Sequence, residues 1–209
     1  MNEWMHTFQT EYKPKLAINA SGVKRGLLKD IYNRSHGFQI IFDELSTLKS
    51  TDYQIIETGT VRNPNNWKDG NSGFLFAELV KMHGGFVRSV DIDQSAVNTA
   101  NNFIDNRYYR SFCSDSVSWL ASLSDLNSVN LFYLDSYDVD WTNDDPSAQH
   151  HLKEFKAIEP YLSNCIVAID DNAFLSNGQR TGKGRAIYQY LAEKNIFPLY
   201  DEYQIIYKF

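Results

Sequence analysis

The chain has 209 residues, and its 26 acidic side chains against 20 Lys and Arg give a formal net charge of -6. This balance argues against a protein that binds nucleic acid through a basic face, because such binding depends on neutralising phosphates. No apolar run reaches the roughly 20 residues of a transmembrane helix, and residues 1–25 contain no apolar block of signal-peptide length. We therefore expect a soluble, cytoplasmic protein that binds neither nucleic acid nor membranes.

The N-terminal region, residues 1–36, is mixed and polar, and we expect a helical extension with one helix over 24–32. This extension could lie over a site or pack against a partner, and the sequence leaves the oligomeric state open, a homodimer included. The remaining residues, 37–209, are enough to bury a single core without a disulfide. Cys113 and Cys165 both lie in apolar runs, so we expect two reduced, buried thiols.

From residue 38 onward, short apolar runs alternate with longer amphipathic stretches, which is typical of parallel strands joined by crossover helices. The expected strands are 53–57, 86–91, 108–113, 129–134, 165–169, 197–200 and 204–209. The expected helices are 38–48, one capped by Ser72 and ended by Gly84, 95–104, a short one through Trp119, 147–162 and 185–194. This order predicts an α/β fold with a doubly wound, mostly parallel seven-stranded sheet, helices on both faces and an antiparallel C-terminal hairpin.

Five of the expected strands end in acidic or polar residues, and open α/β sheets bind their ligands at the carboxyl ends of the strands. These residues are Glu57, Asp91, Asp115, Asp135 and the pair Asp171-Asn172. A single acid of this kind is ordinarily a solubilising loop residue. Five on one edge of a sheet indicate a functional site instead.

The turn after the first strand, Glu57-Thr58-Gly59-Thr60, indicates which cofactor binds at this edge. A dinucleotide site would carry G-x-G-x-x-G here, so that backbone amides and a helix N-terminus could bind the pyrophosphate. This turn has a single glycine, and its acid would repel a phosphate but suits a cationic amino acid. Asp91, after the second strand, fits a ribose with free hydroxyls. An adenosyl ligand that lacks phosphate and carries a cationic amino acid is S-adenosylmethionine.

Residues 38–209 resemble the class I S-adenosylmethionine-dependent methyltransferases. The resemblance rests on four short motifs that follow successive strands: Glu57-Thr58-Gly59-Thr60, Val90-Asp91-Ile92-Asp93, Ser114-Asp115-Ser116 and Leu134-Asp135. It implies that residues 37–209 form a cofactor-binding methyltransferase domain. Glu57 and Gly59, with Thr60 in the same turn, would lie near the methionine part of the cofactor, and Asp135 would border it from the fourth strand.

The same resemblance implies which residues bind the adenosine part of the cofactor. Asp91 would bind the ribose hydroxyls, and Asp115, helped by Ser116, would lie at the adenine. Trp119 could stack on the adenine, but an aromatic side chain on an amphipathic helix could equally pack in the core.

Asp135, Asp171 and Asn172 form a second group, at the ends of the fourth and fifth strands. Three oxygen ligands, completed by water or substrate oxygens, suit a hard cation such as Mg²⁺. The group resembles the metal site of the catechol, caffeoyl-coenzyme A, macrocin and sugar O-methyltransferases, with Asp170 as a spare ligand one residue out of register. The resemblance implies an ion that binds the acceptor hydroxyl and lowers its pKa. Alternatively, residues 170–172 only end a strand and begin a turn.

The catechol branch of these enzymes has a lysine three residues after the first metal ligand that acts as general base, whereas this chain has Asp138 there. Asp138 could be a metal ligand, a base or a hydrogen-bond acceptor for a polyol. The candidate catalytic residues are therefore Asp135, Asp138 and His150, with His151 as a further candidate, because His accepts a proton near neutral pH. A surface His pair near a helix start is the alternative.

Two loops complete the expected edge. The basic segment 178–185 resembles a phosphate loop without having its spacing. We interpret it as a mobile loop at the rim of the site, in which Arg180, Lys183 or Arg185 contacts an anionic substrate. The segment 63–71 could cover the cofactor or form part of an acceptor pocket, and its Trp67 could also be a hydrophobic anchor.

These observations predict an S-adenosylmethionine-dependent methyltransferase that methylates the oxygen of a small hydroxylated acceptor, such as a sugar, a polyketide-like compound or a phenol, with help from Mg²⁺ or another divalent cation. One alternative is a nucleotide-dependent oxidoreductase on the same fold, against which the missing glycine motif argues. Another is a noncatalytic cofactor-binding domain. Within the leading class, methylation of nitrogen or carbon without a metal stays open.

Overall fold

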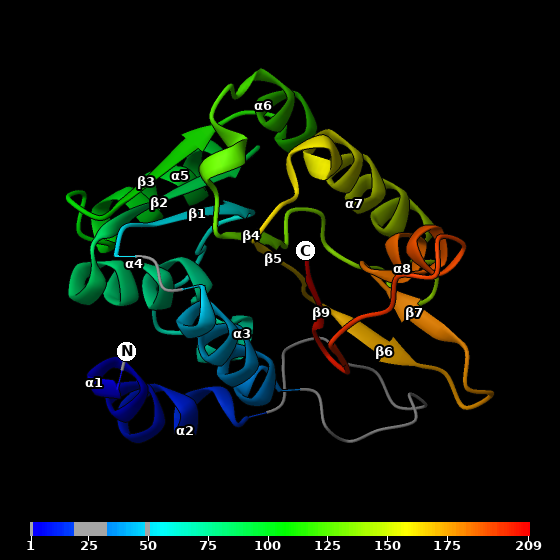
Figure 1. Cartoon of the computed structure of the whole chain (residues 1–209), viewed down its shortest axis with the longest axis horizontal. Coiled ribbons are helices and arrows are strands. Elements are labelled where there is room, and N and C mark those ends of the chain that lie inside the picture. The colour runs from blue at the N-terminus through cyan, green and yellow to red at the C-terminus, as the bar shows by residue number, and fades with distance from the viewer. Residues whose placement is uncertain (1, 19–32, 49–50) are drawn as a thin grey trace.

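The computed structural model describes residues 2–18, 33–48 and 51–209 (Figure 1), so the helix expected over 24–32 lies outside the described residues. Its centre is a seven-stranded sheet with the order β3-β2-β1-β4-β5-β9-β8. The strands are β1 (Tyr53–Thr58), β2 (Gly85–Asp91), β3 (Tyr109–Cys113), β4 (Leu131–Leu134), β5 (Ile166–Ile169), β8 (Tyr200–Asp201) and β9 (Ile205–Lys208). β1 to β5 are parallel, β9 is antiparallel to β5, and β8 is antiparallel to β9. The predicted sheet and its antiparallel hairpin are confirmed.

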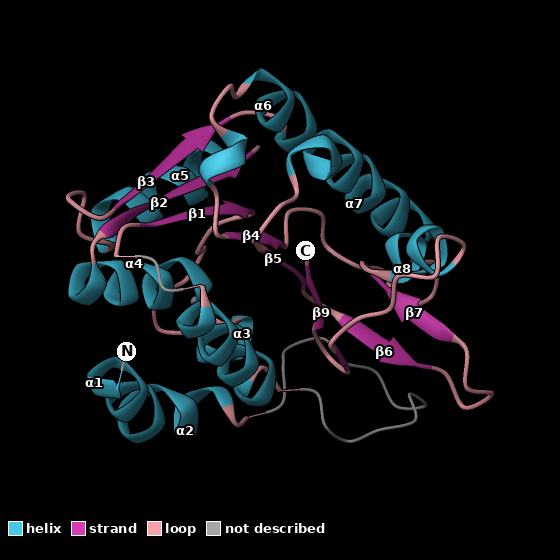
Figure 2. Ribbon diagram, in the orientation of Figure 1, coloured by secondary structure: helices cyan, strands magenta, loops and turns pink. Residues whose placement is uncertain are grey.

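Helices cover both faces of this sheet (Figure 2). They are α1 (Asn2–Thr7), a π-helical turn (Phe8–Tyr12), α2 (Lys13–Leu16), α3 (Ser35–Thr47), α4 (Ser72–His83), α5 (Gln94–Phe103), α6 (Ser116–Ser122), α7 (Asp145–Ile158) and α8 (Arg185–Ala192). β4 shows the two faces, because successive side chains of a strand point to opposite sides. Leu131 and Tyr133 pack with residues of α3 and α4, while Phe132 and Leu134 pack with residues of α6, α7 and α8. All four are buried, as expected for a parallel strand between two helical layers.

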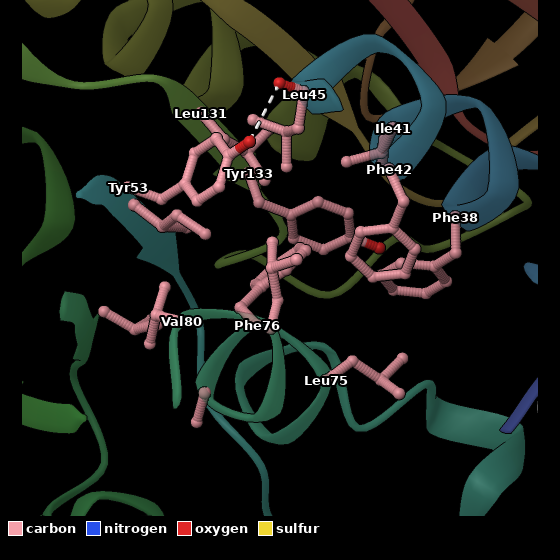
Figure 3. Close-up of a cluster of buried hydrophobic side chains, with 14 of the residues drawn as sticks. Phe38, Ile41, Phe42, Leu45, Tyr53, Leu75, Phe76, Val80, Leu131 and Tyr133 are labelled. Atoms are coloured by element: carbon pink, nitrogen blue, oxygen red, sulfur yellow. Dashed lines mark hydrogen bonds between the residues drawn. The ribbon is translucent and has the colours of Figure 1, made fainter. Parts of the chain in front are cut away.

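The first of these clusters fixes α3 against the sheet (Figure 3). The ring of Phe38 stacks on that of Tyr133 with centroids 5.7 Å apart, and Phe76 of α4 meets Tyr133 edge-on at 5.3 Å. At the far end of α3, the Tyr53 hydroxyl donates to the carbonyl of Leu45 at 3.2 Å. Because α3 is held along its length, the residue that precedes it has a defined place at the carboxyl edge of the sheet.

The N-terminal segment packs into the same cluster, although its sequence is largely polar. Trp4, Phe8 and Leu16 are buried and belong to the core that includes Phe42 of α3. The Trp4 ring meets Phe42 edge-on with centroids 5.0 Å apart. Aromatic side chains of this size each remove a large apolar area from water, so residues 2–18 lie on the molecule as a packed layer.

Two local expectations are wrong. Cys113 is exposed, because it is the last residue of the edge strand β3, whereas Cys165 is buried as expected. Ser72 does not cap α4. The N-cap is Asn71 in a left-handed conformation, and the Ser72 hydroxyl donates to Glu57 instead. A serine before an apolar run indicates a cap only when no buried acceptor competes for its hydroxyl.

The segment after β5, expected as a loop, contains a small two-stranded ribbon. Its strands are β6 (Asn172–Phe174) and β7 (Arg180–Gly182), which pair antiparallel with Asn172 opposite Gly182. Three residues a strand are too few to give a recognisable alternation in the sequence. Within residues 2–18, 33–48 and 51–209, every helix is too short or too polar to span a bilayer.

Candidate functional site

The turn after β1 lies against the end of β4. Gly59 has a φ of +82°, a left-handed conformation that favours glycine. A Cβ atom at Gly59 would lie 2.5 Å from the backbone oxygen of Asp135, so a larger residue would push the two segments apart. The Gly59 amide donates to the carbonyl of Val90 at 2.8 Å, which ties the turn to β2. Gly59, the single glycine of the predicted motif, is therefore required at the point where the ends of β1, β2 and β4 lie together.

A cavity of about 390 Å³ opens at this meeting point. Its lining includes five of the residues predicted for the site: Gly59, Thr60, Asp91, Asp135 and Asp138. Asp69 and Asp93 add further carboxylates to the wall, against the guanidinium of Arg62. The wall is acidic on balance, which favours a cationic ligand over a phosphate.

Glu57 lies beneath the cavity rather than in its wall. Its side chain is buried, and one carboxylate oxygen accepts a hydrogen bond from Ser72, which does line the cavity. The other oxygen, Oε2, has no hydrogen-bond partner among the described residues. Burial raises the pKa of Glu57 to about 7. A cation in the cavity would therefore favour the ionised form of this carboxyl, which the protein alone holds only weakly.

Asp91 links the turn after β1 to the end of β2. Its Oδ2 accepts from the Thr60 amide at 3.1 Å, and its Oδ1 accepts from the Asp93 amide at 2.9 Å. Burial raises the pKa of Asp91, although these two amides oppose the shift. The carboxylate is thus held at the point where an acid in such a sheet hydrogen-bonds a ribose.

A second cavity of about 230 Å³ shares part of its wall with the first. Asp91, Ser136 and Tyr137 line both, and Asp115 and Ser116 line the second. The Asp115 carboxylate also caps α6 by accepting from the Ser118 amide at 2.9 Å. The structure therefore brings Asp91, Asp115 and Ser116 to the wall of one cavity, which Gly59 does not line.

The two histidines lie on α7, behind the second cavity. His150 lines that cavity, with its Nε2 2.9 Å from the Ser116 hydroxyl oxygen and 3.4 Å from Glu154. His151 is fully buried, and burial lowers its pKa to about 4. Glu154 is also buried and accepts from the Ser136 hydroxyl at 2.6 Å. His150 is placed with the predicted adenine residues, whereas Asp138 lines the first cavity.

Both candidate aromatic residues have protein neighbours. Trp119 packs against the second core cluster, and its ring centroid lies 5.7 Å from that of Phe112. Trp67 stacks on Tyr12 of the N-terminal segment at 5.9 Å, with the Lys15 ammonium over its face. These contacts favour the packing interpretation for Trp119 and the anchor interpretation for Trp67.

Three carboxylates converge at the ends of β4 and β5. One oxygen from each of Asp135, Asp170 and Asp171 lies within 4.8 Å of the others. Asp170 is fully buried, while the side chains of Asp135 and Asp171 keep exposed fractions of 20 % and 16 %. Like charges this close are strongly unfavourable without a cation among them.

The protein supplies two cations to these carboxylates. The buried ammonium of Lys183 contacts Oδ1 of Asp135 and lies 2.9 Å from Oδ2 of Asp171. Arg34, just before α3, places its Nε 2.5 Å from Asp170 and its Nη2 3.0 Å from Asp171. Burial acts to raise the pKa of Asp171, but Lys183 and Arg34 outweigh it and hold that pKa well below its usual range.

Asn172, a predicted metal ligand, is turned away from this cluster. Its amide nitrogen donates to the carbonyls of Ile169 and Asp170 at 2.9 and 3.0 Å, and its amide oxygen accepts from the Gly184 amide at 2.7 Å. Asp171 has a φ of +52°, which turns the chain at that residue. The side chain of Asn172 therefore points in a different direction from those of Asp170 and Asp171. The residue in the third position of the cluster is therefore Asp170.

The three carboxylates are ligands of the type that binds a hard cation, but their present contacts do not leave room for one. Carboxylate oxygens are the ligands that Mg²⁺ prefers, and the cluster provides one from each of three residues. Lys183 and Arg34 already engage all three carboxylates, however. An ammonium in contact with two of the ligands leaves no place for a divalent ion between them.

The other charged groups singled out in the sequence are also paired within the protein. Arg180 forms a two-point ion pair with Asp201, and Arg185 donates to Asp144 and Asp145 at 2.9 and 2.8 Å. Asp138 pairs with Arg62 at 2.7 Å, and both of these side chains are more than half exposed. The cations of residues 178–185 are thus bound to carboxylates of the chain.

Sequence reasoning missed Arg34 and the pairing of Lys183 with acids. Arg34 belongs to a segment without a motif, and nothing in its neighbours indicates a buried ion pair. Only a weak pattern in the sequence indicates a site role for Lys183, which lies between two glycines a short distance after the acidic end of β5. Glu154 was missed because a single polar residue on an amphipathic helix looks solvent-facing, and Ser72 was interpreted only as a helix cap.

No protein-family model and no curated protein matches the sequence. Among solved structures, the chain is similar to a human methyltransferase 10 domain containing protein, with 9 % identity, coverage of 100 % of this chain and 97 % of that one, and a TM-score of 0.52. It is also similar to CalS11, a TDP-rhamnose 3'-O-methyltransferase of calicheamicin biosynthesis, with 15 % identity, coverage of 83 % and 80 %, and a TM-score of 0.51. At these identities the likeness shows the fold, which is that of the class I methyltransferases.

Proposed function

We propose that this chain is an S-adenosylmethionine-dependent methyltransferase that methylates a hydroxyl oxygen of a small acceptor, of the sugar, polyketide-like or phenolic class. The observation that carries the proposal is the pair of cavities along the carboxyl edge, which share part of their walls. Asp91 lies between them, the turn at Gly59 and Thr60 borders one, and Asp115 and Ser116 border the other. From the first cavity to the second, this order matches the amino-acid part, the ribose and the adenine of one extended ligand.

The charge of the wall supports the same ligand. Glu57 and Asp91 both have pKa values raised by burial and make no ion pair within the described residues. A ligand with a sulfonium and an ammonium would supply the missing positive charge. A pyrophosphate would face Asp69, Asp91 and Asp93 across the cavity, which disfavours a nucleotide-dependent oxidoreductase.

The cofactor, when bound, supplies a methyl group on a positively charged sulfur, which an oxygen can attack directly. The chain's own contribution is to position the two reactants in line and to exclude water, because this reaction needs little acid-base chemistry beyond loss of the hydroxyl proton. Asp135 lines the cavity at the end of β4 and would accept a hydrogen bond from the acceptor hydroxyl. Asp138, at the same wall, is the other carboxylate able to take the proton.

Calorimetry with S-adenosylmethionine and S-adenosylhomocysteine tests the proposal. We expect binding at a single site, and Asp91→Ala should weaken it by roughly 10 to 100-fold, because hydrogen bonds to a charged group contribute about 1.5–3 kcal/mol. Asp105→Asn is the matched control, since Asp105 pairs only with Arg107 on the surface and lies outside both cavities.

Three results would contradict the proposal. Equal affinities of wild type and Asp91→Ala would remove Asp91 from the site. Thermal stabilisation by NAD without stabilisation by S-adenosylmethionine would favour the oxidoreductase. Tight cofactor binding without methyl transfer to any member of a broad hydroxyl panel would favour a noncatalytic domain.

A further inference from the structure

We propose that Lys183, together with Arg34, takes the place of the divalent metal at the carboxyl edge, so that Asp135, Asp170 and Asp171 form a metal-free site held by internal cations. Removal of the Lys183 ammonium should convert the same three carboxylates into a binding site for a divalent cation. The inference concerns the edge at which the proposed function places the acceptor, but it is tested by metal binding alone.

The first step is the position of the ammonium. Oxygens of the three carboxylates lie within 4.8 Å of one another, which is a spacing that one ion can bridge. Lys183 contacts Asp135 and lies 2.9 Å from Asp171, so its nitrogen occupies the space between two of the three ligands. A divalent cation at the same place would overlap the ammonium sterically and would be repelled by its charge.

The second step is charge. Lys183 and Asp170 are almost wholly buried, and Arg34 has an exposed side-chain fraction of only 7 %. The two cations offset two of the three negative charges, so the cluster without a metal keeps one formal negative charge. Buried carboxylates are tolerated only with such compensation. A divalent ion at this place would have to displace the Lys183 ammonium from Asp135 and Asp171.

The third step is how the chain delivers Lys183. The ribbon of β6 and β7 returns the backbone to the end of β5, and the Lys183 amide donates to the Asp171 carbonyl at 3.1 Å. Gly182 has a φ of +107°, and a Cβ there would lie 2.2 Å from the same carbonyl oxygen. Asn172 holds the next residue, Gly184, through its side-chain oxygen. Both neighbours of Lys183 are therefore fixed.

Arg34 is equally well anchored from the other side. Its Nη1 donates to the Lys68 carbonyl at 2.6 Å, and its guanidinium lies over the Tyr203 ring at 5.0 Å from the centroid. Tyr203 in turn donates from its hydroxyl to Asp171. Lys183 and Arg34 thus approach the carboxylates from different segments, and each is held by contacts outside the cluster.

This arrangement makes Lys183 a positioning residue. It holds Oδ1 of Asp135, while Asp135 lines the cofactor cavity. The orientation of the carboxylate that faces the acceptor is then set by an ammonium rather than by a metal ion. Lys183 thereby holds Asp135 as a hydrogen-bond acceptor in a fixed position for methyl transfer.

The experiment measures Mn²⁺ binding by calorimetry and thermal unfolding with and without Mg²⁺, Mn²⁺ and chelator. The wild type should show no saturable Mn²⁺ binding and the same melting temperature in chelator and in Mg²⁺. Lys183→Ala should melt at a lower temperature, gain the saturable Mn²⁺ binding that the wild type lacks, and recover stability when Mn²⁺ is added. Lys183→Gln, which keeps the length of the side chain, repeats the test if the alanine variant fails to fold.

The controls separate charge replacement from general loosening. Lys194→Ala removes an exposed lysine paired with Glu159 and should gain no Mn²⁺ affinity. Lys183→Arg keeps the positive charge and should not gain it either. Combining Lys183→Ala with Asp171→Asn removes one ligand and should abolish the gain.

Two outcomes would overturn the inference. The first is saturable Mn²⁺ binding by the wild type with a rise in melting temperature, which would mean that the metal displaces Lys183. The second is a folded Lys183→Ala or Lys183→Gln variant without any gain in Mn²⁺ affinity. Failure of the cofactor titration alone would refute the proposed function and leave this result standing, because no methyl donor is present in the metal experiment.

Discussion

The two halves of the carboxyl edge treat their acidic side chains differently. Beside β1 and β2, Glu57 and Asp91 are held by hydroxyl and amide donors and make no ion pair within the described residues. Beside β4 and β5, the acids are neutralised by Lys183 and Arg34. Carboxylates that make no ion pair suit a cationic ligand, whereas carboxylates already paired with Lys183 and Arg34 do not need one. The two halves therefore differ in how their acids are compensated, which a list of the acids does not show.

The largest effect is expected when the compensated half loses a cation. Arg34→Ala leaves Asp170 buried without its partner and should lower the free energy of unfolding by about 3–5 kcal/mol, as for other broken buried pairs. Urea unfolding measures this loss. Combining Arg34→Ala with Asp170→Asn should restore part of it, because the uncompensated charge is then absent. A loss of less than about 1 kcal/mol would place the Arg34 pair in the class of weak surface ion pairs.

A pH effect should distinguish the uncompensated half. The pKa of Glu57 is raised by burial to about 7 from an ordinary value of 4.5, so between these values the folded state binds more protons than the unfolded state. Stability should therefore fall as pH rises through this window, by about 3 kcal/mol at most. Urea unfolding at several pH values should show this fall in the wild type and not in Glu57→Gln.

The same titration should affect the cofactor. Ionised Glu57 attracts a cationic ligand, so affinity for S-adenosylmethionine should be greater above pH 7 than below it, and Glu57→Gln should remove the difference. Calorimetry on either side of pH 7 measures this. A pH dependence unchanged in Glu57→Gln would mean that the charge beneath the cavity does not reach the ligand.

The smallest effect is expected at the rim. Asp138 and Arg62 form an exposed pair, and Asp138→Asn should change the free energy of unfolding by no more than about 0.5 kcal/mol. Thermal unfolding checks this. Because stability is spared, any large loss of methyl transfer in this variant would report a chemical role for Asp138, whereas a loss of stability above about 1 kcal/mol would show that the pair is structural.

The fold could be predicted because it depends on patterns that the sequence carries openly. β4 and β5 are continuous apolar runs, and their buried neighbours alternate between the two helical layers. The acids at strand ends and the glycine at residue 59 also have local signatures, so five of the residues that line the first cavity could be named from the sequence. These signals concern backbone conformation and burial, which short windows of sequence determine.

The carboxylate cluster at the ends of β4 and β5 could not be predicted in the same way, because it depends on side-chain direction and distant pairing. The left-handed φ of +52° at Asp171 decides that Asp170 rather than Asn172 faces the cluster, and no residue type signals it reliably. Arg34 meets Asp170 across 136 positions of sequence. The packing of Trp4 and Phe8 in the core could not be predicted for the same reason, because their partners lie far along the sequence, in α3.

The contact between Tyr12 and Trp67 couples two segments that are far apart in the sequence. One segment is the N-terminal layer, and the other is the loop that follows Gly59 and borders the cofactor cavity. Segments joined by a packed aromatic contact are expected to open together in amide hydrogen exchange, as one cooperative unit. Fluctuation of residues 2–18 would thus uncover the cavity from its rim, and a ligand that seals the cavity would slow exchange in a helix that it never touches.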